Sequence, residues 1–176
     1  MAILLTYEEV SSAVTMAEAV AALEEGFRVQ ARGEVSLPPR LTTPASKGWI
    51  RMMPAAASGM GVMGFKAMNL VPRVGVRYVV FLYRVLDGAL LAIIDAAPIT
   101  TQRTGAVSAV ATKWMARPDA STVGVLGSSA EAKAQLLAMA TVRPVRSAKV
   151  FSPNPEHRRR NVPRAGDRRD PGRVGA

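Results

Sequence analysis

The 176-residue chain contains no cysteine and only one histidine, and just 5% of its residues are aromatic. Without cysteine it can form no disulfide framework, thiolate nucleophile or cysteine-based metal site. The single histidine, His157, has no histidine or cysteine near it in the sequence, so we expect no metal site. The apolar fraction of 49% is sufficient for a core, which Ala, Val, Leu and Met must fill. A reducing cytoplasm fits this composition.

The sequence also lacks a secretory signal and any apolar run long enough to cross a bilayer. Its N-terminus has no basic segment and turns acidic at Glu8 and Glu9. Arg, Asp or Lys interrupts each apolar run before it reaches the roughly 20 residues that a membrane helix needs. We therefore expect a cytoplasmic protein with no membrane partner.

The net charge of +10 is unevenly distributed along the chain. Half of it comes from residues 158–176, which hold seven arginines against Asp167 and Asp170. Residues 161–176 have no periodicity and almost no large apolar residue, as an out-of-frame reading of GC-rich DNA would produce. We expect a disordered tail there and no nucleic-acid partner. The alternative, nucleic-acid binding through the tail, predicts salt-sensitive binding that is lost when residues 158–176 are deleted.

Residues 1–102 predict helices followed by a mostly antiparallel sheet, which is an α+β arrangement. Thr6 is a suitable N-cap and Gly33 a suitable C-cap, and the apolar spacing between them indicates two helices separated near Thr15. Asp87-Gly88 favours a hairpin turn. We expect strands at residues 48–53, 62–68, 78–83 and 90–95, with a loop of small residues at 54–61.

Residues 103–160 have a different pattern. A long helix at 103–116 precedes a short apolar strand at 122–126, a turn at Gly127, a helix at 130–140 and a strand at 146–152. Strand, glycine turn, helix and strand form one βαβ unit, which begins a parallel sheet. The predicted fold class is therefore α/β: an α+β domain followed by an incomplete Rossmann-type βαβ domain.

Gly127 marks the first candidate site. A strand that enters a glycine turn and a helix N-terminus offers backbone N–H groups and a positive dipole end to a pyrophosphate. The dinucleotide pattern requires a second glycine where this chain has Ser129, whereas Ala132 can serve as the third small residue. On spacing alone, an ordinary βα turn explains the residues equally well.

Three cations form the second set of candidates. Arg103 follows Thr100 and Thr101 near an expected helix N-terminus, where a cation is unfavourable unless it holds an anion. Lys66 interrupts an apolar strand, and a lysine there either points outward or lines a cleft. Arg40 follows two prolines. Taken singly, Arg103 and Lys66 are better explained as solvated surface residues, and Arg40 fits either role.

The order of these motifs along the chain is more specific than any one of them. The order is Pro-Pro-Arg40, Met53-Pro54, Gly64-Phe-Lys66, Asp87-Gly88, Asp95, Ile99-Thr-Thr-Gln-Arg103-Thr-Gly-Ala106 and Val123-Gly-Val-Leu-Gly127-Ser-Ser-Ala-Glu-Ala132. From residue 3 to about residue 160, this order resembles the ornithine cyclodeaminase/mu-crystallin family. The most specific part is the box around Arg103, after a hairpin and before the glycine turn.

The resemblance implies a substrate-binding and dimerisation domain at residues 1–102, followed by the start of an NAD(P)-binding Rossmann domain at 103–160. Enzymes of the family transfer hydride between NAD or NADP and an imine or amine carbon of an amino or imino acid. By matching position, the substrate carboxylate would be held by Arg40, Lys66 and Arg103, with Lys66 also near the reacting centre as a catalytic residue. Cofactor contacts would come from Gly127, Ser128, Ser129, Ala130, Ser152 and Asn154. A homodimer is expected.

Three features depart from the family pattern. Ser129 replaces a glycine, and Arg51-Met52 stands where ornithine-cyclising members carry a glutamate, which argues against ornithine as the substrate. The family's catalytic aspartate and remaining Rossmann strands would lie beyond residue 160. We therefore expect this chain to be catalytically inactive. The alternative is a non-catalytic, ligand-binding and dimerising protein of the mu-crystallin type.

Overall fold

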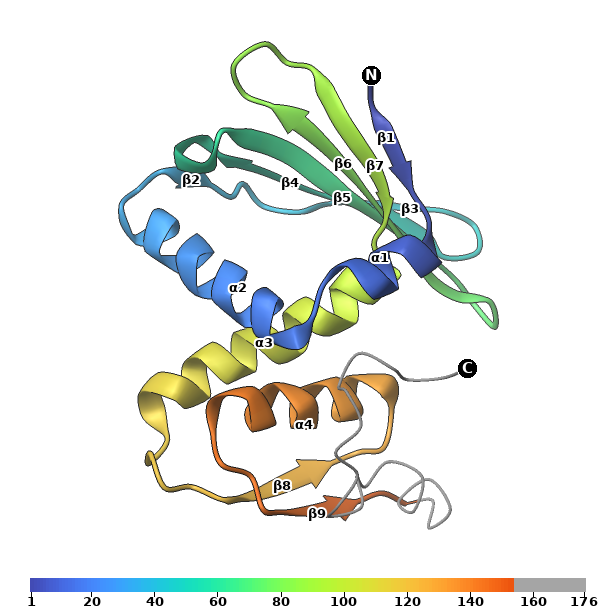
Figure 1. Cartoon of the computed structure of the whole chain (residues 1–176). Coiled ribbons are helices and arrows are strands. Elements are labelled where there is room, and N and C mark those ends of the chain that lie inside the picture. The colour runs from blue at the N-terminus through green and yellow to red at the C-terminus, as the bar shows by residue number, and fades with distance from the viewer. Residues whose placement is uncertain (154–176) are drawn as a thin grey trace. The chain divides into compact units, whose positions relative to one another are not determined.

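A computed structural model of the chain describes residues 1–153, which form two compact units. The first unit comprises Met1–Ala13 and Glu25–Thr100, and the second comprises Val14–Glu24 and the chain from Thr101 onward. The boundaries therefore fall inside two helices, at Glu24/Glu25 and at Thr100/Thr101. Figure 1 shows a sheet in the first unit and a helix packed on two strands in the second.

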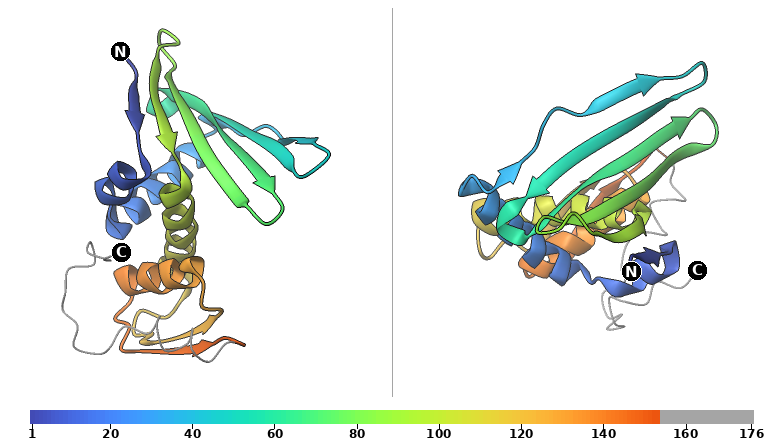
Figure 2. Two further views of the ribbon diagram at one scale, coloured as in Figure 1. Left: turned by 90° about the vertical axis from the view of Figure 1, so that its right-hand side faces the viewer. Right: turned by 90° about the horizontal axis from the view of Figure 1, so that it is seen from above.

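The first unit is built on a seven-stranded sheet with the spatial order β1-β7-β6-β5-β4-β2, in which β3 also pairs with β4. Strand β1 runs parallel to β7, and the other neighbours are antiparallel. Figure 2 shows the twist of this sheet in two further views. The strands are β1 (Ile3–Leu5), β2 (Val35–Ser36), β3 (Leu41–Pro44), β4 (Trp49–Ala57), β5 (Val62–Val71), β6 (Gly75–Arg84) and β7 (Leu90–Asp95).

The loop predicted at residues 54–61 is wrong for its first half. Strand β4 continues through Pro54 to Ala57, and a short 3-10 helix, η1 (Ser58–Met60), follows. On one side of β4, β3 pairs with residues 49–52 and β2 with residues 56–57. Pro54 falls between these two paired stretches, where neither β3 nor β2 offers an acceptor for a backbone N–H. A proline, which lacks this N–H, is therefore tolerated there.

The two helices expected between Thr6 and Gly33 are confirmed as α1 (Tyr7–Ala13) and α2 (Met16–Ala31). Each begins with a capping box. The Glu9 carboxylate accepts hydrogen bonds from the Thr6 N–H at 2.8 Å and the Thr6 hydroxyl at 2.9 Å. Glu18 does the same with Thr15, at 2.8 and 2.7 Å. These pairs satisfy N–H groups that a helix leaves unbonded at its start.

The long helix begins earlier than the sequence indicated. Helix α3 spans Ala97–Met115, so Arg103 lies in its second turn rather than at its first residue. Asp95 accepts a hydrogen bond from the Ala97 N–H at 3.1 Å. Pro98 is tolerated in the first turn of α3, because the N–H groups of that turn have no acceptor within the helix. The interpretation of Arg103 as a cation at a helix N-terminus is therefore wrong.

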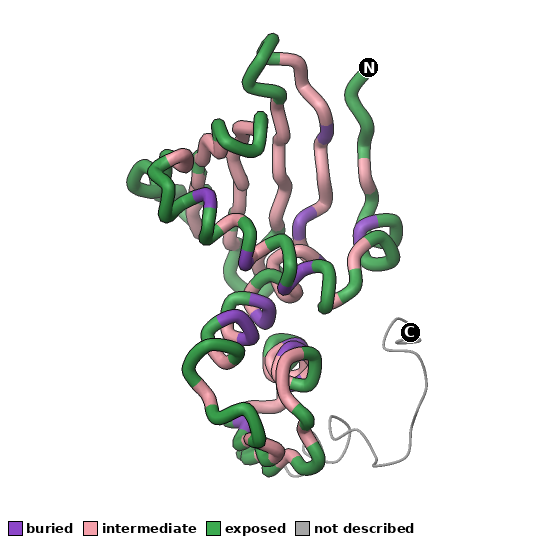
Figure 3. Tube along the Cα trace, turned by 60° about the vertical axis from the view of Figure 1, so that its left-hand side comes forward, coloured by how far each residue is buried: buried purple, intermediate pink, exposed green. Residues whose placement is uncertain are grey.

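The second unit contains the predicted βαβ arrangement. Strands β8 (Thr122–Leu126) and β9 (Ser147–Phe151) are parallel, and α4 (Ala130–Val142) connects them. A core of small side chains joins α2, α3 and α4: Ala19, Val20, Ala106, Ala109, Val110 and Ala138. Figure 3 shows these buried positions clustered on the helices, whereas most of the sheet of the first unit has intermediate exposure.

The predicted fold class is confirmed: the chain is a mixed α/β protein with a largely antiparallel sheet and a parallel βαβ unit. No helix within residues 1–153 is long and apolar enough to cross a membrane.

Candidate functional site

One face of the first unit's sheet carries Lys66. In β5, Lys66 lies directly opposite Met53 of β4 and Val80 of β6, and Val80 in turn lies opposite Ile94 of β7. Directly paired residues of neighbouring strands point to the same side of a sheet. The ammonium group of Lys66 therefore projects from an otherwise apolar row of side chains.

Lys66 is half-buried and leans along the sheet. Its Nζ atom lies 5.5 Å from the centre of the Tyr78 ring, in the next row of the same face. This position lets the positive charge interact with the negative face of the ring while the stem packs on the sheet. The ammonium group of Lys66 therefore has an aromatic neighbour on its own face of the sheet.

The other two predicted carboxylate ligands lie on different elements. Arg40 is exposed, one residue before β3, in the stretch that joins β2 to β3 of the same sheet as Lys66. Arg103 is an exposed residue of α3 and belongs to the second unit. Arg40 and Lys66 therefore belong to the first unit, with Arg40 next to β3 and Lys66 in β5 of the same sheet. Arg103 belongs to the second unit, whose part of α3 begins at Thr101.

The glycine turn after β8 has the backbone that its sequence predicted. Gly127 has a φ of +112°, in a region that side-chain-bearing residues rarely adopt, and its N–H donates to the Phe151 carbonyl at 2.8 Å. This bond ties the turn to the end of β9. The chain can then enter α4 directly, so that the first N–H groups of the helix lie beside the turn.

Two predicted cofactor residues are joined by a hydrogen bond. The hydroxyl oxygens of Ser128 and Ser152 lie 2.8 Å apart, and Ser152 is only 4% exposed. This pair links the turn after β8 to the end of β9, the two places where a dinucleotide contacts such a fold. Asn154, predicted beside the ribose, lies outside the described residues.

Ser129 is the N-cap of α4, and Ala130 is the first helical residue. The Ser129 hydroxyl accepts a hydrogen bond from the Ala132 N–H at 3.3 Å. The hydroxyl thereby uses one of the N–H groups that a bound phosphate could otherwise take. The glycine turn and the remaining N–H groups fit the pyrophosphate of a dinucleotide. Ser129 leaves fewer free N–H groups for it, because its hydroxyl already binds the Ala132 N–H.

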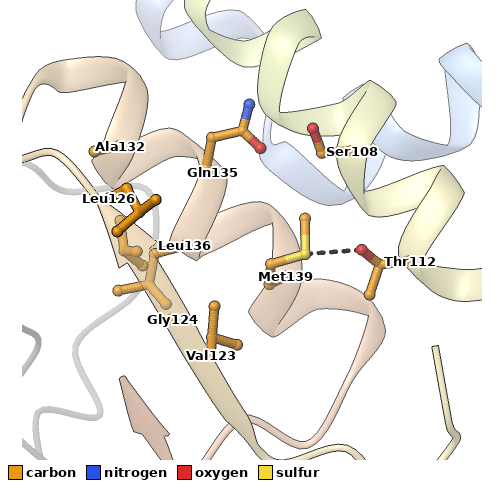
Figure 4. A pocket seen from close by; sticks show the side chains of 10 residues that line it. Ser108, Thr112, Val123, Gly124, Leu126, Ala132, Gln135, Leu136 and Met139 are labelled. Atoms are coloured by element: carbon orange, nitrogen blue, oxygen red, sulfur yellow. Dashed lines mark hydrogen bonds between the residues drawn. The ribbon is translucent and has the colours of Figure 1, made fainter. Parts of the chain in front are cut away.

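A pocket of about 340 Å³ lies between α3, β8 and α4 of the second unit. Two of its polar side chains are already engaged. The Thr112 hydroxyl donates to the Met139 sulfur at 3.0 Å (Figure 4), and the Gln135 amide donates to the Thr104 carbonyl at 3.2 Å. None of the lining residues between 1 and 153 is charged. It is therefore suited to apolar packing rather than to a charged substrate.

The opposite face of the first unit's sheet has a second pocket, of about 430 Å³, lined in part by Pro54, Met63, Phe65 and Tyr83. The Phe65 and Phe81 rings stack there with centres 4.8 Å apart. Side chains near the edge of this face are exposed, among them Leu41, Ile50 and Met52, at 64%, 49% and 39%. Most of the residues that line this pocket are apolar, whereas Asn69 and Arg77 lie farther along the same face.

The structure adds one residue to the candidates. Arg51 of β4 lies on the same face as Lys66, because Arg51 pairs with Met68 and Lys66 with Met53, two residues along each strand. The alternation in Trp49-Ile-Arg51-Met-Met53 was a usable signal, since it places Arg51 and Met53 on one face of a strand. The register with β5 was needed to connect Arg51 with Lys66.

Within residues 1–153, no group of three or more His, Cys, Asp or Glu side chains could hold a metal ion.

Comparisons with known proteins agree on one family. Alanine dehydrogenase from Archaeoglobus fulgidus is 36% identical over 155 residues, which cover 85% of this chain and 48% of that protein. L-lysine cyclodeaminase from Streptomyces rapamycinicus is 35% identical over 159 residues, covering 82% of this chain and 45% of that protein. The chain therefore spans about half the length of the relatives it matches.

Solved structures support the same assignment. An archaeal alanine dehydrogenase dimer with bound NAD has a TM-score of 0.86 and 34% identity, covering 92% of this chain and 52% of that one. The Thermococcus litoralis Δ1-pyrroline-2-carboxylate reductase in complex with NADH and L-proline has a TM-score of 0.83 and 29% identity, covering 90% of this chain and 51% of that one. The model of the ornithine cyclodeaminase/mu-crystallin family matches residues 1–169, and the chain belongs to that family.

Proposed function

We propose that this chain supplies the substrate-binding sheet and the first part of the cofactor-binding domain of an NAD(P)-dependent enzyme that acts on an amino or imino acid. Residues 1–102 would bind the substrate, and the chain from residue 103 would begin the dinucleotide-binding domain. The observation that carries the proposal is the turn at Gly127, whose φ of +112° joins a parallel strand to the N-terminus of α4. When bound, the nicotinamide would accept or donate a hydride at the imine or amine carbon.

The cofactor's pyrophosphate would lie against Gly127, Ser128, Ser129 and Ala130. Backbone N–H groups at the start of α4 would donate to its oxygens, and the helix dipole would favour its negative charge. The pair formed by Ser128 and Ser152 would hold the turn in the required shape, with Ser152 near the adenosine ribose.

The substrate's carboxylate would be held by Lys66 together with Arg40, both of the first unit, and Arg103 of the second unit stays a predicted carboxylate ligand. The apolar row around Lys66 supports this role, because a cation among apolar neighbours binds an anion more strongly than it would in water. Lys66 would also lie near the reacting carbon, where an ammonium group can hold or deliver a proton. Replacing Lys66 with Gln should therefore weaken binding of amino acids, and Lys66→Arg should restore part of it.

The cofactor step is tested by titrating the 176-residue chain with NADH and following nicotinamide fluorescence. The variant Gly127→Ala should abolish binding, because an alanine is strained at this φ. Gly33→Ala is the matched control: Gly33 has a φ of +77°, so an alanine there is similarly strained, but Gly33 belongs to the first unit and Gly127 to the second. Loss of NADH binding in both variants, or in neither, would contradict the proposed cofactor site.

A turnover assay on the same chain separates an enzyme from a non-catalytic binding protein. NADH oxidation with an imino acid supports catalysis by this chain, whereas binding of NADH and amino acid without turnover supports the mu-crystallin-like alternative.

We further propose that the sheet face opposite Lys66 pairs with a second copy of the chain. The exposed residues Leu41, Ile50 and Met52 form an apolar patch there, since Leu41 lies directly opposite Met52 across β3 and β4. Contiguous apolar patches on a protein surface often mark sites of contact with another protein. One solved relative is described as a dimer, which supports the choice of a second copy.

The dimer is tested by light scattering after size-exclusion chromatography. Met52→Asp should convert a dimer to a monomer, because it places a charge inside the apolar contact. Leu86→Asp is the control, since Leu86 is equally apolar, 89% exposed and situated in the turn between β6 and β7. A wild-type monomer would refute the proposed dimer.

A further inference from the structure

Two cations lie close together on the sheet face that carries Lys66. Met53, the direct partner of Lys66, is two residues from Arg51 in β4, so Arg51 and Lys66 are diagonal neighbours. Diagonal neighbours of an antiparallel pair are about 7–8 Å apart at the backbone, within reach of long side chains. Lys66 also leans toward this row, because its Nζ lies against Tyr78, which pairs with Met68 opposite Arg51.

The side chain of Arg51 is held in place. Its Nε donates to the Thr42 hydroxyl at 2.9 Å, and the guanidinium carbon lies 4.6 Å from the centre of the Trp49 ring. Arg51 is half-buried and forms no ion pair with any residue between 1 and 153. Thr42 and Trp49 thus orient a guanidinium whose charge stays unneutralised within the described part of the chain.

The chemistry of this arrangement favours a bound anion. A guanidinium has five N–H donors, and only one of them is used by Thr42, so a fork remains for bidentate binding of a carboxylate. No carboxylate side chain occupies the paired positions of this face in β4, β5 and β6. Lys66 nearby adds a second positive charge, which raises the affinity of the face for a ligand with two negative groups.

We propose that Arg51 binds the side-chain carboxylate of the substrate, and that the substrate class is a dicarboxylic amino or imino acid of the aspartate or glutamate type. The α-carboxylate would be held by Lys66, so the inference rests on the proposed function. Arg51 then determines specificity: it attracts a distal carboxylate and repels the distal ammonium of a diamino acid.

The test is calorimetric titration of the 176-residue chain, with and without NADH, using pairs of amino acids of matched shape. L-aspartate should bind at least about tenfold more tightly than L-asparagine, and L-glutamate should show the same advantage over L-glutamine. The reason is that each amide loses a charge-assisted bidentate contact. L-ornithine should bind more weakly than either acid.

Variants of Arg51 test the assignment of the residue. Arg51→Gln should remove most of the preference for aspartate over asparagine, and Arg51→Glu should reverse the order of aspartate and ornithine. Arg77→Gln is the matched control, because Arg77 is an exposed cation of the same sheet that pairs with Asn69 on the opposite face. Circular dichroism of each variant checks that the fold is retained.

The outcomes separate this inference from the function on which it rests. If no amino acid binds at all, the proposed function fails, and the inference fails with it. If asparagine or ornithine binds as tightly as aspartate, or if Arg51→Gln keeps the full preference for aspartate, the substrate class is wrong while the proposed function stands.

Discussion

The guanidinium of Arg143 donates a hydrogen bond to the carbonyl oxygen of Ala116 at 2.8 Å, where helix α3 ends. The same Nη2 atom lies 3.0 Å from the Thr112 carbonyl and 2.8 Å from the Lys113 carbonyl, and Nε donates to Arg117 at 3.0 Å. Arg143 itself is the C-cap residue of α4. One side chain therefore satisfies the last carbonyls of α3 from the end of the next helix.

Replacing Arg143 with Ala should destabilise the chain by about 2–3 kcal/mol, because half-buried carbonyl groups lose a charged donor. Arg143→Lys should recover only part of the loss, since an ammonium has no planar fork. Urea unfolding followed by circular dichroism measures both. The control is Arg146→Ala, which removes an exposed arginine three residues away whose side chain bonds to none of residues 1–153. Equal effects of the two alanine variants would contradict this account.

The motif around Arg103 has a packing role that can be tested separately from binding. A Cβ atom added at Gly105 would lie 2.8 Å from the Ala134 carbonyl oxygen and 3.2 Å from the Ala138 Cβ. At Gly105, α3 and α4 therefore approach each other too closely for a larger side chain. Gly105→Ala should destabilise the chain by about 1–3 kcal/mol, because the neighbouring backbone must move.

Gly26→Ala is the matched control for this prediction. Gly26 lies inside α2, and a Cβ there would meet nothing within 4 Å. Alanine has the higher helix propensity, so this change should stabilise the chain by about 0.5–1 kcal/mol. Opposite shifts of the thermal midpoint in the two variants are expected. A neutral or stabilising Gly105→Ala would show that the helices do not pack as closely as described.

The helices were predictable from the sequence because their signals are local. Thr6 was identified as an N-cap, and the apolar spacing that follows placed the break between the two helices near Thr15. The structure adds a capping box at each of these threonines. Strand β1 was missed because it has only three residues and pairs with β7, about ninety positions away. The extension of β4 through Pro54 was missed because its tolerance depends on the gap between β2 and β3, which is not a local property.

In the candidate site, too, the local features were predictable from the sequence and the contacts between distant residues were not. Gly127 was identified because a strand, a glycine and a helix follow one another in the sequence. The pairing of Ser128 with Ser152 joins residues 24 positions apart, and its geometry depends on the parallel register of β8 and β9. Arg51 was interpreted only as a departure from a family pattern, because its position beside Lys66 is set by the register of β4 and β5.

The capping boxes should make stability depend on pH in the acid range. Hydrogen bonds from the Thr6 N–H and then from the Thr6 hydroxyl lower the pKa of Glu9 below its ordinary value of 4.5, and Thr15 lowers the pKa of Glu18 in the same way. A lowered pKa in the folded state means that the stabilisation is present above pH 4.5 and is lost as the pH falls through the folded-state pKa.

Glu9→Gln and Glu18→Gln should therefore flatten the decrease of the urea midpoint below pH 4.5, while glutamine keeps a capping-box acceptor at neutral pH. Glu8→Gln is the control, since it removes a charge from the same first turn of α1 and its carboxylate bonds to none of residues 1–153. An unchanged acid limb in the Glu9 and Glu18 variants would contradict a role for these carboxylates in the pH dependence.

Ser129 offers a way to separate helix capping from cofactor binding. Its hydroxyl caps α4 through the Ala132 N–H, in the position where the dinucleotide pattern has a glycine. Ser129→Gly should cost only a few tenths of a kcal/mol, because glycine is itself an acceptable N-cap. It should also tighten NADH binding several-fold, since removal of the side chain lets the backbone N–H groups approach the pyrophosphate.

Ser129→Ala should cost about 1 kcal/mol and leave NADH affinity unimproved, because it removes the cap and keeps the Cβ atom. Thermal unfolding and NADH fluorescence titration of both variants distinguish the two effects. If Ser129→Gly weakens NADH binding, then the hydroxyl contributes to the cofactor site directly, and the turn accommodates the pyrophosphate with the serine in place.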